Sequence, residues 1–183
     1  RGEKIPKEVE PRPKAIMDMN ANALISLANK IKIDEKLPTN NDFLIGGVVT
    51  PFAPKTGWPA TNLTEKVEAG AQFMITHTCL DMEIMKIYME RLIATKLLRK
   101  MHLIAGAAIL KSADDAKWLR ENRPNVMIPV EAVSRLEKSE DPEKEGIKMC
   151  AEQLTALSKL PGVSGAHIIA SNSVLNIPEA IAL

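Results

Sequence analysis

Aromatic residues are scarce in this chain, and neither sign of charge is in excess. Aromatics make up 3% of the 183 residues, and 24 Lys and Arg face 23 Asp and Glu. Proteins that bind nucleic acids usually present a basic surface and aromatic side chains on which bases stack. The sequence therefore predicts no nucleic-acid partner.

Cysteine and long apolar runs are also nearly absent. Cys79 and Cys150 are the only cysteines and form no C-x-x-C pair, which excludes a disulfide framework or a cysteine-rich zinc site and is typical of the reducing cytoplasm. No apolar run approaches the roughly 20 residues that span a bilayer. The first residues contain no apolar segment of a signal peptide. We therefore expect a cytoplasmic chain without a membrane partner.

The chain begins with Arg1 rather than Met, and its first 15 residues are rich in Pro, Lys and Glu. This start predicts a loop over residues 1–18. It also suggests a processed protein, a fragment or an incompletely represented chain. With 45% hydrophobic residues, the length suits one ordinary domain, so residues 1–183 are predicted to form a single domain with βα units from residue 19 onward.

Short apolar runs alternate with segments of helical periodicity. The runs predict strands at residues 43–49, 72–76, 102–109 and 166–169, and the periodicity predicts helices near 20–32, 63–69, 81–100, 112–121, 142–160 and 177–183, with a further helical stretch after 129. Such alternation is typical of right-handed βαβ units and a parallel sheet, either doubly wound or a (β/α)₈ barrel. A barrel needs eight strands and about 250 residues, so four strands correspond to half of one.

Polar residues follow the predicted strands, where parallel α/β proteins place their sites. His77 stands directly after a predicted strand, among small polar neighbours. A structural histidine with satisfied hydrogen bonds is the alternative, but this position favours a ligand contact. His102 and His167 do not pair with His77 at ligand spacing, so no metal site is predicted. Gly46 and Gly47 lie within a strand and indicate close packing, since a phosphate-binding loop would precede a helix.

The order of several motifs resembles that of the methylenetetrahydrofolate reductase family. Residues 66–77 read K-V-E-A-G-A-Q-F-M-I-T-H, which is similar to the family's K-V-D-A-G-A-x-x-x-I-T-Q. Residues 162–172 resemble its G-V-x-G-x-H-F-Y-T-L-N, and residues 126–129 resemble its V-x-I-P. The first three residues are similar to the end of its L-R-G-D. The resemblance covers essentially the whole chain and implies the later half, strands 5–8, of a (β/α)₈ TIM-type barrel.

The resemblance also implies roles for individual residues. Arg1, Gly2 and Glu3 would lie beside the ring of FAD, with Glu3 as the catalytic carboxylate that tunes the flavin and faces the pterin. The residues matched to contacts with the FAD ribose, adenine side or diphosphate are Asn20, Thr50, Asn62 and Lys66. The residues matched to the folate substrate are His77, Ile109, Leu110 and Asn172. The family's general acid, a Glu at the end of the first strand, would precede Arg1.

Three departures from the family pattern stand out. His77 replaces a Gln, Glu65 replaces an Arg next to the diphosphate lysine, and Ser173 replaces an Arg. They indicate a divergent branch whose electron donor is either NAD(P)H or the redox centre of a partner. An open half barrel also leaves strand edges unpaired, so we expect no turnover from these residues alone.

The resemblance implies a flavin-dependent oxidoreductase that interconverts 5,10-methylenetetrahydrofolate and 5-methyltetrahydrofolate by hydride transfer through FAD. We expect it to act as a homo-oligomer or as a subunit of a larger complex. One alternative is a non-redox subunit that binds folate or a methyl carrier. Another is an aldolase-type lyase barrel, because residues 47–52 contain V-T-P-F, although no lysine suited to a Schiff base follows in a strand.

Overall fold

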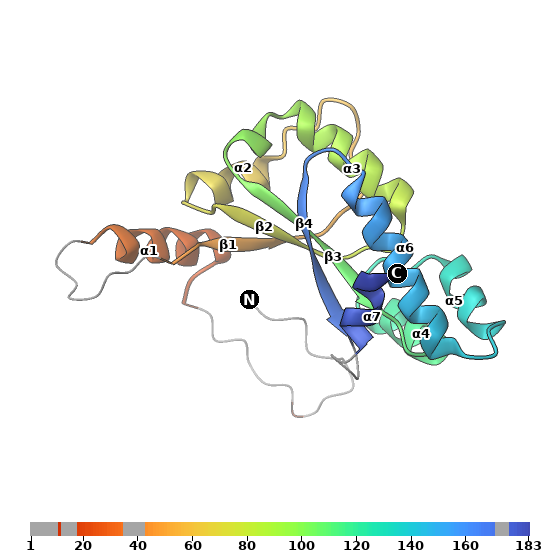
Figure 1. Cartoon of the computed structure of the whole chain (residues 1–183). Coiled ribbons are helices and arrows are strands. Elements are labelled where there is room, and N and C mark those ends of the chain that lie inside the picture. Colours follow the sequence, from red (N-terminus) through yellow and green to blue (C-terminus); the bar gives the residue numbers. More distant parts are fainter. Residues whose placement is uncertain (1–10, 12–17, 35–42, 171–175) are drawn as a thin grey trace.

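The computed structural model describes residues 11, 18–34, 43–170 and 176–183 of the chain. Within them, four parallel strands form one sheet in the order β1-β2-β3-β4 (Figure 1). The strands are β1 (Gly46–Val49), β2 (Phe73–Thr78), β3 (His102–Ile109) and β4 (Val163–Ala170). The prediction of an α/β fold with a parallel sheet is therefore confirmed.

Helices connect the strands, as the alternating pattern predicts. They are α1 (Ala21–Ile33), α2 (Thr61–Glu68), α3 (Met82–Ala94), the 3₁₀ turn η1 (Leu97–Arg99), α4 (Ala113–Asn122), α5 (Val130–Glu137), α6 (Pro142–Ser158) and α7 (Ile177–Ala182). Asp81 caps α3 by accepting a 3.0 Å hydrogen bond from the Ile84 amide. No helix in the described part of the chain is long and apolar enough to cross a membrane.

Some predicted boundaries are wrong. The helix predicted to run to about residue 100 ends at Ala94, because the Thr95 hydroxyl donates to the Leu92 carbonyl and Lys96 takes a left-handed conformation with φ 63°. β2 continues two residues beyond its predicted end, which places His77 inside the strand. β4 begins three residues earlier than predicted, directly after the turn at Gly162.

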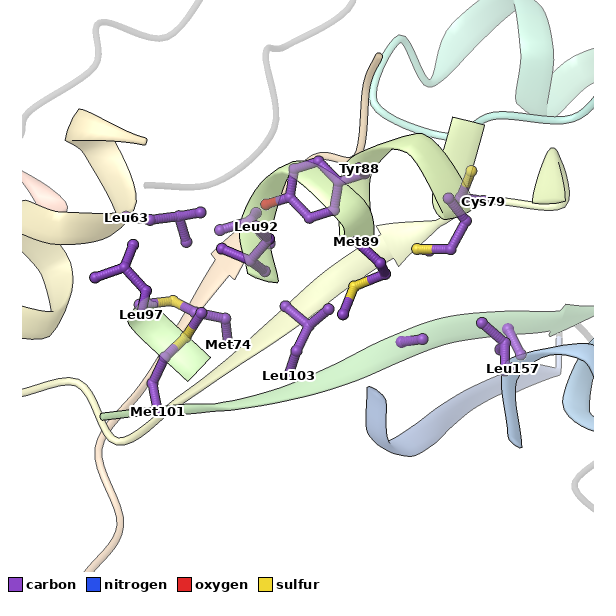
Figure 2. Packing of buried hydrophobic residues seen from close by; sticks show 14 of the residues in the cluster. Leu63, Met74, Cys79, Tyr88, Met89, Leu92, Leu97, Met101, Leu103 and Leu157 are labelled. Atoms are coloured by element: carbon purple, nitrogen blue, oxygen red, sulfur yellow. The ribbon is translucent and has the colours of Figure 1, made fainter. Parts of the chain in front are cut away.

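The helices cover one face of the sheet. The main hydrophobic cluster joins alternate strand residues to α2, α3 and α6, and Figure 2 shows Met89 and Leu92 of α3 packed close to Leu103 of the sheet. The other face is exposed: Val48 and Ile169 keep 52% and 48% of their surface in solvent, whereas Val49 keeps 8%. Parallel sheets usually bury both faces, so this open face sets the sheet apart.

Close packing explains the glycine pair in β1. A Cβ on Gly46 would collide with the ring of Phe73, and one on Gly47 would lie 2.9 Å from the sulfur of Met74. Both neighbours belong to the adjacent strand, with which these glycines are in register. The interpretation of the pair as a packing feature rather than a phosphate loop is confirmed.

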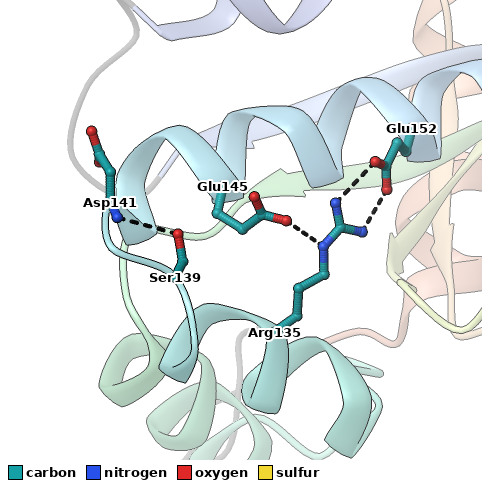
Figure 3. Close-up of polar contacts among 5 residues, drawn as sticks. All are labelled: Arg135, Ser139, Asp141, Glu145 and Glu152. Atoms are coloured by element: carbon teal, nitrogen blue, oxygen red, sulfur yellow. Dashed lines mark hydrogen bonds and ion pairs between the residues drawn. The ribbon is translucent and has the colours of Figure 1, made fainter.

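A second hydrophobic cluster lies at the carboxyl end of β3, where Ala108 and Leu110 pack against α4, α5 and Met149 of α6. Arg135 of α5 ties this unit together. Its guanidinium bonds Glu145 and forms a two-pronged pair with Glu152, at 2.6 and 2.9 Å (Figure 3). Bidentate pairing of this kind fixes geometry as well as adding energy, so α5 is held against α6 by charge as well as by apolar packing.

Candidate functional site

A cleft of about 360 Å³ opens at the carboxyl end of β1, between the β1–α2 loop, α2 and α3. The residues that line it are Val48, Val49, Thr50, Phe52, Trp58, Asn62, Leu63, Lys66 and Tyr88. Carboxyl ends of parallel strands are where such folds bind their ligands. Three residues predicted from the sequence to contact the cofactor, Thr50, Asn62 and Lys66, thus come together in one cleft.

Lys66 provides the positive charge of the cleft. Its ammonium donates a 2.7 Å hydrogen bond to the Val48 carbonyl of edge strand β1. No carboxylate pairs with it in the described part of the chain, and desolvation lowers its pKa below the ordinary lysine value. An ammonium has three donors, so two remain for a ligand. A half-buried cation without a counter-ion is suited to hold an anion.

Three aromatic rings form the wall beside this lysine. Phe52, Trp58 and Tyr88 lie with ring centroids 5.3 to 5.9 Å apart, in edge-on and tilted pairs. Tyr88 is 1% exposed and burial raises the pKa of its hydroxyl, whereas Phe52 keeps 42% of its surface in solvent. The sequence has two Trp, one Tyr and three Phe. That three of these rings gather at one place was not predicted from the sequence, because Tyr88 lies on α3 whereas Phe52 and Trp58 lie in the β1–α2 loop.

Next to the cleft, a side-chain hydrogen bond links α1 to α2. Asn22 donates a 2.9 Å hydrogen bond to the carboxylate of Glu65, the residue before Lys66. Asn20 accepts a 2.8 Å bond from the Ala23 amide and so caps α1. This hydrogen bond of Asn20 is therefore structural, and Asn20 does not line the cleft. Its contact with a cofactor stays a prediction.

His77 lies where β2 departs from a regular ladder. The register with β3 shifts between Ile75 and Thr78, so that β2 holds one extra residue. Thr76 occupies the bulge with a buried hydroxyl that accepts a 2.8 Å bond from the Gly106 amide. Bulges re-aim side chains near functional sites. His77 is half-buried and burial lowers its pKa, which favours the neutral imidazole with one donor and one acceptor nitrogen.

The other predicted substrate contacts are placed differently. Ile109 and Leu110 are buried, with 5% and 1% exposure, in the two hydrophobic clusters. Neither lines the cleft at β1, so their contact with folate stays a prediction. Arg1, Gly2, Glu3 and Asn172 lie outside the described residues. Among the described residues, no group of three or more His, Cys, Asp or Glu is arranged to hold a metal ion.

Comparison with protein families identifies the chain. The family described as "Methylenetetrahydrofolate reductase" matches residues 48–182, which is more than half of the sequence and extends from the second half of β1 through α7. The chain belongs to the methylenetetrahydrofolate reductase family. This confirms the resemblance read from residues 66–77 and 162–172.

Among solved structures, the chain is similar to an uncharacterized protein from Clostridium thermocellum that binds two copies of 5-methyl-5,6,7,8-tetrahydrofolic acid. The two share 18% sequence identity with a TM-score of 0.50, over 77% of this chain and 52% of that one. At this identity the likeness concerns the fold. The chain spans about half the length of that structure. A search of curated proteins found no match.

Membership of the reductase family raises the question whether the cleft suits FAD. Lys66, which pairs with no carboxylate of the described residues, supplies an ammonium for a phosphate, while Thr50 and Asn62 supply neutral hydrogen-bonding groups suited to a ribose or a phosphate oxygen. Glu65, in place of the family's Arg, adds a negative charge beside this lysine. The residues present thus fit part of a dinucleotide, with one cation where the family pattern has two.

Proposed function

We propose that this chain is part of a flavin-dependent oxidoreductase that interconverts 5,10-methylenetetrahydrofolate and 5-methyltetrahydrofolate. The observation that carries the proposal is the convergence of Thr50, Asn62 and Lys66 on one cleft. All three residues match positions of the family's motifs that contact FAD. Family membership supports the same reaction.

Within this proposal, Lys66 holds a phosphate of FAD, and Thr50 and Asn62 orient its ribose or diphosphate. FAD, when bound, supplies hydride transfer between the folate and either NAD(P)H or a partner's redox centre. His77 hydrogen-bonds the pterin, and its lowered pKa keeps both a donor and an acceptor nitrogen available at neutral pH. The proposed roles of Arg1, Gly2, Glu3, Asn20, Ile109, Leu110 and Asn172 are those that the family's motifs imply.

We further propose that the sheet is half of an eight-stranded barrel. The order β1-β2-β3-β4 with all strands parallel is that of consecutive barrel strands. The exposed face, with Val48 and Ile169 at about half their full exposure, would then become the barrel interior. The part of this chain that matches the C. thermocellum structure covers 52% of it, which is consistent with a barrel that contains further βα units.

A flavin titration tests the oxidoreductase proposal. We expect FAD fluorescence to be quenched by the chain and the affinity to fall about tenfold in Lys66→Met, since a charge-assisted hydrogen bond contributes roughly 1.5 kcal/mol. Lys55→Met, which removes an exposed lysine from the β1–α2 loop, is the matched control and should bind like the parent chain. Equal affinity of the Lys66 and Lys55 variants, or no binding at all, would contradict the proposal.

Retention of the flavin tests the half-barrel proposal separately. A chain that provides only half of the pocket should lose FAD during gel filtration. If the 183-residue chain instead carries FAD in stoichiometric amounts through the column, it forms a complete site by itself and the half-barrel argument fails.

A second candidate is a non-redox subunit that binds folate. Glu65 favours it, because its carboxylate, which accepts a hydrogen bond from Asn22, occupies the position of a phosphate-binding Arg in the family. The C. thermocellum protein, described as binding a methylated folate, supports it as well. Binding of 5-methyltetrahydrofolate with no measurable affinity for FAD would select this function over the oxidoreductase. The aldolase-type alternative is disfavoured, because none of the four strands contains a lysine.

A further inference from the structure

We infer that the cleft at β1 also binds a planar aromatic ring bearing a single carboxylate, with the ring on Phe52 and Trp58 and the carboxylate on Lys66. The inference rests on the proposed function only in that it concerns the same cleft and the same lysine. It differs in the ligand: an aromatic carboxylate, rather than a dinucleotide diphosphate, occupies the position.

The charge of the cleft suits one negative group. Among the described residues that line it, Lys66 is the only charged one. Glu65, one position earlier in α2, does not line the cleft, and its carboxylate accepts a hydrogen bond from the neutral amide of Asn22. A single carboxylate would match Lys66 one to one, whereas a diphosphate brings at least two negative charges to one cation. Opposite charges at about 4 Å attract, and like charges repel with the same distance dependence.

The aromatic wall suits a flat ring. Phe52 is 42% exposed although its ring also contacts Trp58 and Tyr88, so part of its surface remains for a ligand. Aromatic pairs in offset or edge-on geometry contribute about 0.5–1.5 kcal/mol beyond the apolar area that they bury. The volume of about 360 Å³ lies near the lower end of the range for small-molecule pockets. A one-ring ligand therefore fits better than an extended one.

Burial of the lysine gives the recognition its strength. Desolvation lowers the pKa of Lys66, and no carboxylate of the described residues compensates the ammonium. A bound carboxylate would replace the missing counter-ion and favour the charged form again. Asn62 lines the same cleft, and its carboxamide can donate a second hydrogen bond to the carboxylate.

Trp58 provides a direct readout, because it lines the cleft while the second tryptophan, Trp118, lies on α4. In a Trp118→Phe background, the fluorescence of Trp58 is followed during titration with benzoate and, separately, with the isosteric neutral benzamide. We expect benzoate to change the emission at millimolar concentrations. Lys66→Met should weaken benzoate about fivefold and benzamide less than twofold, as a partly exposed ion pair would. Lys55→Met should leave both affinities unchanged.

Each result decides the matter. Equal affinity for benzoate and benzamide, or benzoate binding that is unaffected by Lys66→Met, would overturn the inference. FAD is titrated in parallel, so the two proposals can fail independently. Lys66-dependent FAD binding without benzoate binding leaves the flavin proposal standing and removes this one. Lys66-dependent benzoate binding without FAD binding supports this inference and removes the flavin proposal. If both ligands bind, saturating benzoate should raise the apparent Kd for FAD.

Discussion

Gly146 sets how closely α6 approaches the carboxyl end of β3, and replacing it with Ala tests that packing. A Cβ at this position would lie 2.9 Å from the carbonyl carbon of Leu110 and closer still to its oxygen. Carbon atoms in contact are usually about 3.8 Å apart, so relieving the carbon contact alone would move α6 or the end of β3 by about 1 Å, and the nearer oxygen requires a larger movement. The obstacle is backbone, which cannot rotate away.

Two opposing effects determine the size of the change. Ala is favoured over Gly within a helix by about 1 kcal/mol, which would stabilise Gly146→Ala. Overpacking of a close-packed interior costs about 1–3 kcal/mol, and the upper end applies because α6 also buries Ile147 and Cys150 in the main cluster. We therefore expect the free energy of unfolding to fall by about 2 kcal/mol.

Urea unfolding followed by circular dichroism measures this difference, with an unchanged m-value as evidence that the same surface is exposed. Gly165→Ala is the matched control, because a Cβ on Gly165 of β4 meets nothing within 4 Å. It should be as stable as the parent chain or about 0.5 kcal/mol more stable. If Gly146→Ala were also stabilised, helix propensity alone would govern the site and the packing argument would be refuted.

Three further predictions concern hydrogen bonds and charge. Thr76→Val should lower the free energy of unfolding by about 1–3 kcal/mol, because it leaves the buried Gly106 amide unpaired, and Thr76→Ser should be milder in the same urea titration. Asp81→Ala removes the cap of α3 and should cost about 1 kcal/mol. Arg135→Met should cost about 1 kcal/mol at pH 7, since its ion pairs are partly exposed. The Arg135 guanidinium lowers the pKa of Glu152, so that contribution is present above the unfolded carboxyl pKa near 4.3 and should disappear as the pH falls through the lower, folded value. A difference between parent and Arg135→Met that persisted at pH 2 would contradict this account.

Strand positions could be predicted well from the sequence, because short apolar runs separated by Gly and Pro rarely form any other structure than a strand. The end of α3 could not. Thr95 and Lys96 carry no strong stop signal, and the helix ends there because Lys96 adopts a left-handed conformation that usually selects Gly. The open face of the sheet could not be predicted either, since a strand such as β1 has the same apolar pattern whether one face or both are covered.

The candidate site was predicted in part for a different reason. Thr50, Asn62 and Lys66 were found through family motifs, which preserve the order of residues that meet in space. The aromatic wall has no such motif, and Tyr88 belongs to a helix whose periodicity reads as ordinary core. Asn20 was matched by position to a cofactor contact, which stays a prediction, and its side chain caps α1.

The placement of His77 depends on two residues that no motif singles out. The Thr76 hydroxyl accepts a hydrogen bond from the Gly106 amide, and a Cβ on Gly106 would lie only 2.5 Å from the Thr76 carbonyl oxygen. The bulge that orients His77 therefore requires both a hydroxyl at 76 and a glycine at 106. If His77 contacts the pterin as proposed, Thr76→Val should weaken folate binding in addition to lowering stability, whereas Asp81→Ala should lower stability alone. Comparing 5-methyltetrahydrofolate affinity of the two variants under conditions where both are folded separates these effects, and equal affinities would mean that the bulge serves the sheet and not the site.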